Sequence, residues 1–168
     1  MTLKTGVLIL VCILMGPSVL WAAQGVATIK GTADGSSISG EVRFIETEQG
    51  LDVEAAVSNV PVGKHGFHIH ENGSCEDMGK AAGGHFNPEG TEHGYMPKNG
   101  HQHAHLGDMG NINVADDGVG TLNLLLPGVT FDQINGKAVI LHEKEDDFGQ
   151  PTGNAGGRIG CGVIGLAE

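Results

Sequence analysis

The chain has 168 residues, enough for one domain of ordinary size. Glycine supplies 29 residues and aromatic side chains only 4%, which argues against a helical bundle because glycine weakens helix interiors. Nine basic and 20 acidic side chains give a formal net charge of −11, so the chain is a poor candidate for nucleic-acid binding through phosphate contacts.

The first 23 residues have the layout of a secretory signal peptide. Lys4 precedes an apolar run over residues 6–15, which is too short for a bilayer span of about 20 residues. A Gly-Pro pair ends the run, and two alanines follow. We therefore expect residues 1–23 to be removed on export to the periplasm or the exterior, leaving residues 24–168 with no stable membrane association. The alternative is an uncleaved anchor.

Removal of that segment would leave two cysteines, Cys75 and Cys161. An even count in an exported chain predicts one disulfide, since export leads to an oxidising compartment. The bond would close a loop of about 86 residues and stabilise the fold by roughly 4–5 kcal/mol in the chain-entropy treatment. The alternative is two free thiols.

Short segments with alternating apolar and polar residues follow one another along the rest of the chain. This period of two is typical of half-buried strands. Seven or eight such strands with turn residues between them predict an all-β sandwich or barrel, and no repeat or linker divides it. The segments are residues 26–31, 37–47, 51–60, 65–71, 112–115, 119–126, 137–142 and 159–166.

One tract of about 40 residues, 72–111, has no regular periodicity. Loops of this length in a compact domain are usually functional or disordered. Eight of the nine histidines lie between His65 and His105, so this tract and the strand before it hold most of the imidazoles. We therefore expect a functional loop that metal bonds could order.

The first candidate site is a set of four histidines. His68 and His70 lie two residues apart on a predicted strand, which places both imidazoles on one face. His142 ends a later strand, and His85 follows two glycines. Four imidazoles in one plane would suit Cu(II), which takes tetragonal nitrogen sites. The alternative for such a pair is surface or core histidines without a metal.

The second candidate site lies within the long tract. His85, His93, His105 and Asp108 offer three imidazoles and a carboxylate, a set that can complete a tetrahedral zinc site. Because protein would fill all four positions, that zinc would be structural and would add its binding free energy to folding. The alternative is a solvated histidine-rich loop.

Five specific motifs follow one another along the chain. They are GFHIHE at 66–71, GHFNP at 84–88, HLGD at 105–108, HEK at 142–144, and GNAGGR at 153–158 with CGVIG at 161–165. In this order they resemble the copper/zinc superoxide dismutase family. They cover nearly all of the chain after residue 23, and five motifs in sequence are far more specific than any one of them. The resemblance implies a Greek-key sandwich or flattened barrel of about eight antiparallel strands with long metal-binding loops.

The same resemblance implies a role for each site residue and one copper and one zinc ion per subunit. It places His85 between the two ions, bound through both ring nitrogens, and Asp146 as the carboxylate that links a copper histidine to a zinc histidine. It makes Cys75 and Cys161 the intrachain disulfide. The remaining ligands would be His68, His70 and His142 for copper, and His93, His105 and Asp108 for zinc.

The activity implied by the resemblance is the dismutation of superoxide to oxygen and hydrogen peroxide by an exported enzyme of the bacterial periplasmic type. Arg158 would supply a fixed positive charge for the small anion, and His85 would hold and release a proton. Alternatives remain: Arg158 as an exposed arginine, and Asp146 as a solvated member of the acidic run 143–147. The negative net charge opposes the substrate, so the metals, Arg158 and lysines such as Lys64 must offset it.

Two departures from the family leave questions open. The segment before His105 carries extra residues that include His101 and His103, which could capture metal or simply be solvated. The segment 71–75 is short compared with eukaryotic members, where it joins the dimer contact, so a homodimer is one possibility. Two other functions compete with the enzyme: a non-enzymatic copper/zinc binding or delivery protein, and a structural zinc sandwich for adhesion.

Overall fold

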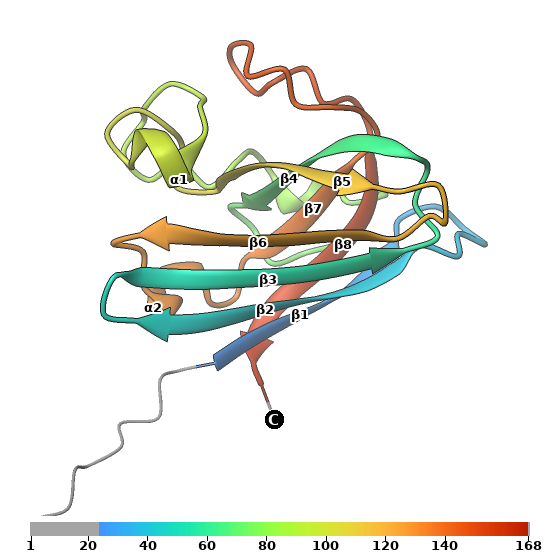
Figure 1. Ribbon diagram of the computed structural model, residues 1–168, viewed down its shortest axis with the longest axis horizontal. Helices are drawn as coiled ribbons and strands as arrows, with labels where there is room; N and C mark the ends of the chain where they lie inside the picture. The colour runs from blue at the N-terminus through green and yellow to red at the C-terminus, as the bar shows by residue number, and fades with distance from the viewer. Residues whose placement is uncertain (1–23, 168) are drawn as a thin grey trace, which may run out of the picture.

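Eight antiparallel strands close into a barrel in the computed structural model, which describes residues 24–167 (Figure 1). The expected signal peptide lies outside the described residues. Within that described part, no helix is both long and apolar enough to cross a membrane. The strands are β1 Gln24–Gly31, β2 Ser39–Thr47, β3 Gly50–Ser58, β4 Gly63–His70, β5 Asp108–Val114, β6 Gly120–Pro127, β7 Ala138–His142 and β8 Arg158–Leu166, and the short helices are η1 Lys80–Ala82, α1 Met96–Asn99 and α2 Phe131–Ile134.

The order of strands around the barrel is β1-β2-β3-β6-β5-β4-β7-β8. The connection from β3 to β4 passes over β6 and β5, and the connection from β6 to β7 passes over β5 and β4. Connections of this kind between antiparallel strands make Greek keys. The all-β Greek-key architecture with about eight strands is therefore confirmed.

The alternation seen in the sequence fills the barrel interior. Opposite Val53 on β3 lies Phe44 on β2, and opposite Ala55 lies Val42, with all four side chains buried. Fully burying one such large apolar side chain stabilises the fold by about 1.5–3 kcal/mol. Polar residues between them point outward, as Glu54 does on β3.

Strand β4 differs from this pattern because both of its faces are covered. Phe67 and Ile69 join the core, whereas His68 and His70 lie on the opposite face and are also buried. β7 pairs with one edge of β4, and β5 with the other edge through a register shift that sets His68 opposite Asp108. His68 and His70 thus stand on a strand that is paired along both edges and covered on both faces.

Two local structures differ from the sequence prediction. β5 begins at Asp108 rather than at residue 112, because Asp108 already pairs with His68 on β4. The chain runs close beside β4 here: a Cβ on Gly107 would lie 2.2 Å from the Ile69 carbonyl oxygen. Glycines near its start hide the alternation. Helix α2 was not predicted, because four residues are too few for a period, although Thr130 and Gln133 form the capping box that could have signalled it.

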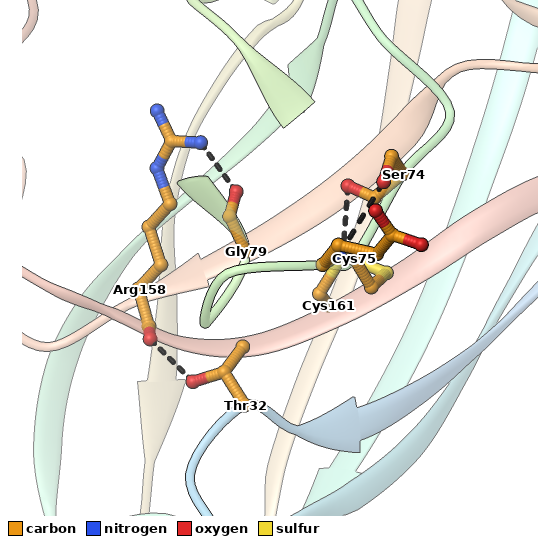
Figure 2. The surroundings of a disulfide bond; sticks show 7 residues. Thr32, Ser74, Cys75, Gly79, Arg158 and Cys161 are labelled. Carbon is orange, nitrogen blue, oxygen red and sulfur yellow. Dashed lines mark hydrogen bonds between the residues drawn. A yellow bond between two sulfur atoms is a disulfide. The ribbon is translucent and has the colours of Figure 1, made fainter. Parts of the chain in front are cut away.

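Two long loops cover the histidine face of the barrel. The first, residues 71–107, carries η1 and α1, and we call it the zinc loop; the second, residues 143–157, we call the channel loop. In Figure 1 the part of the zinc loop that carries α1 and the channel loop lie along the upper side of the barrel. The disulfide between Cys75 and Cys161 ties the start of the zinc loop to β8, as predicted (Figure 2).

Candidate metal centre

The four predicted copper ligands meet on the covered face of β4. His68 and His70 come from β4, His142 ends β7, and His85 is held beside β4 by a single β-bridge to His70. One nitrogen of each ring lies within 4.8 Å of the corresponding nitrogens of the others, and all four residues are buried. Buried imidazoles that converge in this way are a metal-ligand arrangement rather than a set of isolated core histidines.

The zinc ligands form a second cluster that shares His85 with the first. The Nδ1 atoms of His85 and His105 lie 2.8 and 3.2 Å from Asp108 Oδ1, and 3.4 Å from each other. His93 completes the group. Zinc bonds of about 2.0–2.1 Å in a tetrahedron set ligand atoms roughly 3.3 Å apart. The spacing of these donors therefore fits one tetrahedral zinc ion.

Two buried nitrogens without a hydrogen-bond partner support the same assignment. They are Nδ1 of His68 and Nδ1 of His93. A buried polar atom left without a partner costs about 1–3 kcal/mol. Nδ1 of His93 lies 2.8 Å from Asp108 Oδ2 without hydrogen-bond geometry, as two ligands of one ion do. Because Nε2 of His68 is already bonded to Asp146, its Nδ1 is the atom left for copper.

His85 is the one residue common to both clusters. Its Nδ1 faces Asp108 on the zinc side, so Nε2 is left for the copper side. Its ring centroid lies 4.2 Å from that of His68 and 5.4 Å from that of His105, one ligand of each ion. An imidazole with two separate nitrogens can bind one ion on each side, and this ring is placed to do so.

Comparison with known proteins gives the same family. A model of copper/zinc superoxide dismutase matches residues 38–164 of this chain. This chain belongs to the copper/zinc superoxide dismutase family. A relative, superoxide dismutase [Cu-Zn] 2 of Brassica juncea, is 37% identical over 154 residues, which are 85% of this chain and 97% of the relative. The solved structure of the clock protein EA4 has a TM-score of 0.78 and 32% identity, covering 91% of this chain and all of that chain.

Family membership and the two complete ligand sets together make the chain a copper/zinc superoxide dismutase enzyme. The predicted copper ligands and the predicted zinc ligands are confirmed as two clusters joined by His85. A structural zinc sandwich for adhesion would leave the copper cluster without a purpose.

Asp146 stands between the two clusters of this superoxide dismutase. It is fully buried, in contrast to its exposed neighbours Glu145 and Asp147. His68 Nε2 donates to Asp146 Oδ2 at 2.8 Å, and His93 Nε2 donates to Asp146 Oδ1 at 3.0 Å. A carboxylate in this position sets the tautomers and orientations of one copper ligand and one zinc ligand.

Close approach at this carboxylate requires a glycine. A Cβ on Gly153 would lie 1.8 Å from Asp146 Oδ1 and 2.7 Å from His93 Nε2, and the φ angle of Gly153 is +76°. In the sequence Gly153 stands out only as part of a family motif. Asn111, whose amide bonds to the backbone of Asp146, could not be predicted, because nothing in the pattern around it distinguishes it from the other asparagines of the chain.

The surroundings of three copper ligands keep their imidazoles neutral at neutral pH. Burial, helped by neighbouring imidazoles, lowers the pKa of His70 to about 2 and that of His142 to about 3. Burial also lowers the pKa of His85 to about 4, although its hydrogen bond to Asp108 opposes the shift. Neutral imidazoles can bind a cation without first losing a proton.

The two buried carboxylates of the site, Asp108 and Asp146, stay ionised. Burial alone would raise the pKa of Asp108 and of Asp146, but hydrogen bonds from the surrounding histidines hold both well below the usual range. Burial would lower the pKa of His93, but its contacts with these two carboxylates raise it to about 9. The two carboxylates thus favour a positive charge at the position of His93, and a bound zinc ion would supply such a charge.

Arg158 lies at the mouth of the copper cluster. An opening of about 200 Å³ is lined by Arg158 and three copper ligands together with channel-loop residues such as Asn154. The Arg158 guanidinium donates to the carbonyl oxygens of Gly79 and Gly83. The backbone carbonyl oxygen of Arg158 accepts a hydrogen bond from Thr32 Oγ1 at 2.6 Å. Figure 2 shows the Gly79 contact beside the disulfide. Burial lowers the pKa of Arg158, but a guanidinium remains charged in proteins.

The two extra histidines of the zinc loop stay away from both clusters. His101 is exposed, with its Nδ1 2.9 Å from Glu89 Oε1, and His103 is exposed as well. Within residues 24–167 neither belongs to a group of three or more candidate metal ligands. The structure therefore places them on the surface of the loop.

Proposed function

We propose that this superoxide dismutase acts outside the cytoplasm and that Arg158 and His85 are its catalytic residues. The observation that carries the catalytic part is the opening in which the Arg158 guanidinium and three copper ligands meet. Export is supported by Lys4 and the apolar run 6–15, and by a disulfide that an oxidising compartment would maintain. The bacterial periplasmic type fits the same features.

Copper, when bound, supplies the one-electron oxidation and reduction that turn two superoxide ions and two protons into oxygen and hydrogen peroxide, and zinc has no redox chemistry. Arg158 holds the anion at the open side of the copper cluster. Two backbone carbonyls orient its guanidinium, so little side-chain freedom is lost when the anion binds. Its partial burial strengthens the attraction relative to an exposed arginine.

His85 moves the proton. Its Nδ1 is fixed beside Asp108 on the zinc side, so the ring cannot turn away. Its Nε2, on the copper side, can then take up a proton and deliver it to the reduced product. The side chain of His85 is 4% exposed and lines the opening, which leaves it within reach of solvent protons.

The catalytic proposal is tested by Arg158→Ala in the fully metallated protein. We expect kcat/KM for superoxide to fall by about tenfold to a hundredfold, the range seen when a preorganised charged or donor group is lost. Arg43→Ala is the matched control, because Arg43 is an exposed arginine on β2 whose one ion pair within residues 24–167 is with Glu41. An unchanged rate for Arg158→Ala would contradict the role of Arg158, and metal binding without superoxide consumption in the unaltered protein would favour a delivery protein.

The export proposal is tested by expressing the full chain in a bacterium. We expect the periplasmic fraction to contain a chain whose first residue lies near residue 24, with both thiols oxidised. Intact mass and thiol titration measure these properties. A full-length chain in the cytoplasmic or membrane fraction would contradict export with cleavage.

A further inference from the structure

Three successive contacts from the channel loop converge on one zinc ligand, His93. Asp146 accepts a hydrogen bond from His93 Nε2, and Gln150 bonds to the His93 backbone. The ring of Phe148 stacks on the His93 imidazole, with a distance of 6.3 Å between ring centroids and an angle of 19° between ring planes. The residues of this group lie only two apart in sequence. The channel loop thus concentrates three contacts with the zinc loop on His93.

The Gln150 contact uses both ends of the side-chain amide. His93 N–H donates to Gln150 Oε1 at 3.0 Å, and Gln150 Nε2 donates to the His93 carbonyl oxygen at 2.9 Å. His93 lies outside any helix or strand, so no regular structure satisfies these two backbone groups. A two-point bond of this kind restricts translation and rotation of the backbone, and thus the position of the imidazole attached to it.

The Phe148 contact forms although it requires an unfavourable backbone conformation and leaves an apolar residue partly exposed. Phe148 has a φ of +59°, an unfavourable value for a bulky side chain, and its ring is 44% exposed. Its neighbours on the protein side are the rings of His93 and Tyr95. The unfavourable backbone keeps the ring over His93 and brings Gln150 into reach of the His93 backbone two residues later.

We propose that Gln150 is a positioning residue for the zinc site, which acts through the backbone of His93 and sets how tightly this superoxide dismutase holds zinc. The proposal rests on the zinc cluster described above but not on the roles of Arg158 and His85. Because Thr152 and Asn154 line the copper opening, the same bond also anchors the wall of that opening to the zinc loop. Gln150 thus connects zinc retention with the shape of the anion entrance.

The test uses the protein loaded with both metals and two substitutions. Gln150→Ala removes both hydrogen bonds, whereas Gln150→Glu keeps the acceptor for His93 N–H and loses the donor to the His93 carbonyl. Gln102→Ala is the matched control, because Gln102 is an exposed glutamine of the zinc loop that lines a surface pocket with His93, but its side chain makes no hydrogen bond within residues 24–167. The rate of zinc release to an excess of chelating dye is measured for each.

We expect zinc release to be about tenfold faster in Gln150→Ala, intermediate in Gln150→Glu and unchanged in Gln102→Ala, in line with the effect of other outer contacts on metal affinity. A second readout is the visible spectrum of Co²⁺ placed in the zinc site, which should change in Gln150→Ala because His93 shifts. Release rates within about twofold of the unaltered protein, an unchanged cobalt spectrum, or equal acceleration in Gln102→Ala would each overturn the proposal.

If Gln150→Ala does not fold, the release rate of Gln150→Glu decides, since that variant keeps the length of the side chain. Neither readout involves superoxide. A protein with normal turnover and no effect of Gln150 on zinc would refute only the positioning role, and a protein with the zinc effect but no turnover would refute only the catalytic proposal.

Discussion

Asn111 holds the backbone of Asp146 at both of its polar groups: Asp146 N–H donates to Asn111 Oδ1 at 2.7 Å, and Asn111 Nδ2 donates to the Asp146 carbonyl oxygen at 2.9 Å. Asn111 belongs to β5, so the barrel itself fixes the carboxylate that joins the two metal clusters. The linking carboxylate is thus supported from the rigid side of the site rather than from the loop.

Asn111→Ala should therefore weaken metal retention although Asn111 touches no ligand. Two hydrogen bonds in a partly buried place are lost, which corresponds to about 1–3 kcal/mol of stability. We expect zinc affinity to fall by about tenfold, measured by competition with a chelating dye. Asn113→Ala, at an exposed position two residues farther along β5, is the control. Equal affinities for the two variants would show that the barrel does not act through Asp146.

Asp146→Asn should have a larger effect on both metals. An amide keeps one oxygen and replaces the other by a donor NH₂ group, so it cannot receive His68 and His93 on two separate oxygens as the carboxylate does. We expect a loss of about tenfold to a hundredfold in metal affinity. Metal content after dialysis against a weak chelator measures it, and Asp116→Asn in an exposed turn is the control. Full retention of both metals in Asp146→Asn would contradict the linking role.

The disulfide should matter for stability and for the position of Arg158. Replacing Cys75 and Cys161 together by serine removes a constraint on a loop of 86 residues, which is worth roughly 4–5 kcal/mol in the chain-entropy treatment. The same loop carries Gly79 and Gly83, the carbonyl partners of the Arg158 guanidinium.

We therefore expect the double serine variant to unfold at lower urea concentration and also to have a lower kcat/KM for superoxide when fully metallated. Assays well below the unfolding midpoint separate the two effects. A destabilised variant with unchanged kcat/KM would show that Arg158 does not depend on the disulfide for its orientation.

Stability of the metal-free protein should depend on pH in a window set by the copper histidines. The pKa values of His70, His85 and His142 lie at about 2, 4 and 3 in the folded protein, against an ordinary value near 6.5. Between about pH 6.5 and pH 4 the unfolded chain binds up to roughly three more protons than the folded chain. The free energy of unfolding must then fall as the pH falls through this window.

His93 shifts in the opposite sense, because its raised pKa of about 9 makes the folded state bind the extra proton between about pH 6.5 and pH 9. That contribution is fully present below pH 6.5 and is lost as the pH rises. Urea unfolding of chelator-treated protein across the range tests both statements. Stability that stays constant from neutral pH down to about pH 4.5 would contradict the burial of neutral imidazoles.

The sequence made the ligands predictable because their chemistry is local. The spacing of two residues between His68 and His70 predicts that both side chains lie on one face of a strand. Asp108 lies only three residues after His105 in the sequence. Asn111 and Gln150 could not be found in this way, since each acts on a residue dozens of positions away. Amides of Asn and Gln serve equally well in any exposed turn, so only the folded arrangement identifies the two that matter.

The structure also sharpens the expectation about electrostatic steering. Lys64 is one of the lysines expected to offset the negative net charge, but its Nζ lies 2.8 Å from Glu145 Oε1, so the carboxylate largely cancels its field. Glu145 belongs to the channel loop, whose later residues wall the copper opening. Removing this one negative charge should leave Lys64 free to attract superoxide.

Glu145→Gln should raise kcat/KM by about twofold at low ionic strength, and the rate should fall more steeply with added salt, since the Debye length shrinks to about 8 Å near physiological ionic strength. Glu41→Gln is the matched control, because Glu41 forms an equally exposed pair with Arg43 on β2, which is not among the residues lining the opening. Stopped-flow or pulse measurements over a salt series give both quantities. A rate that is flat or rising with salt in the unaltered protein would exclude steering altogether, and identical behaviour of the two glutamine variants would show that the Lys64–Glu145 pair has no part in it.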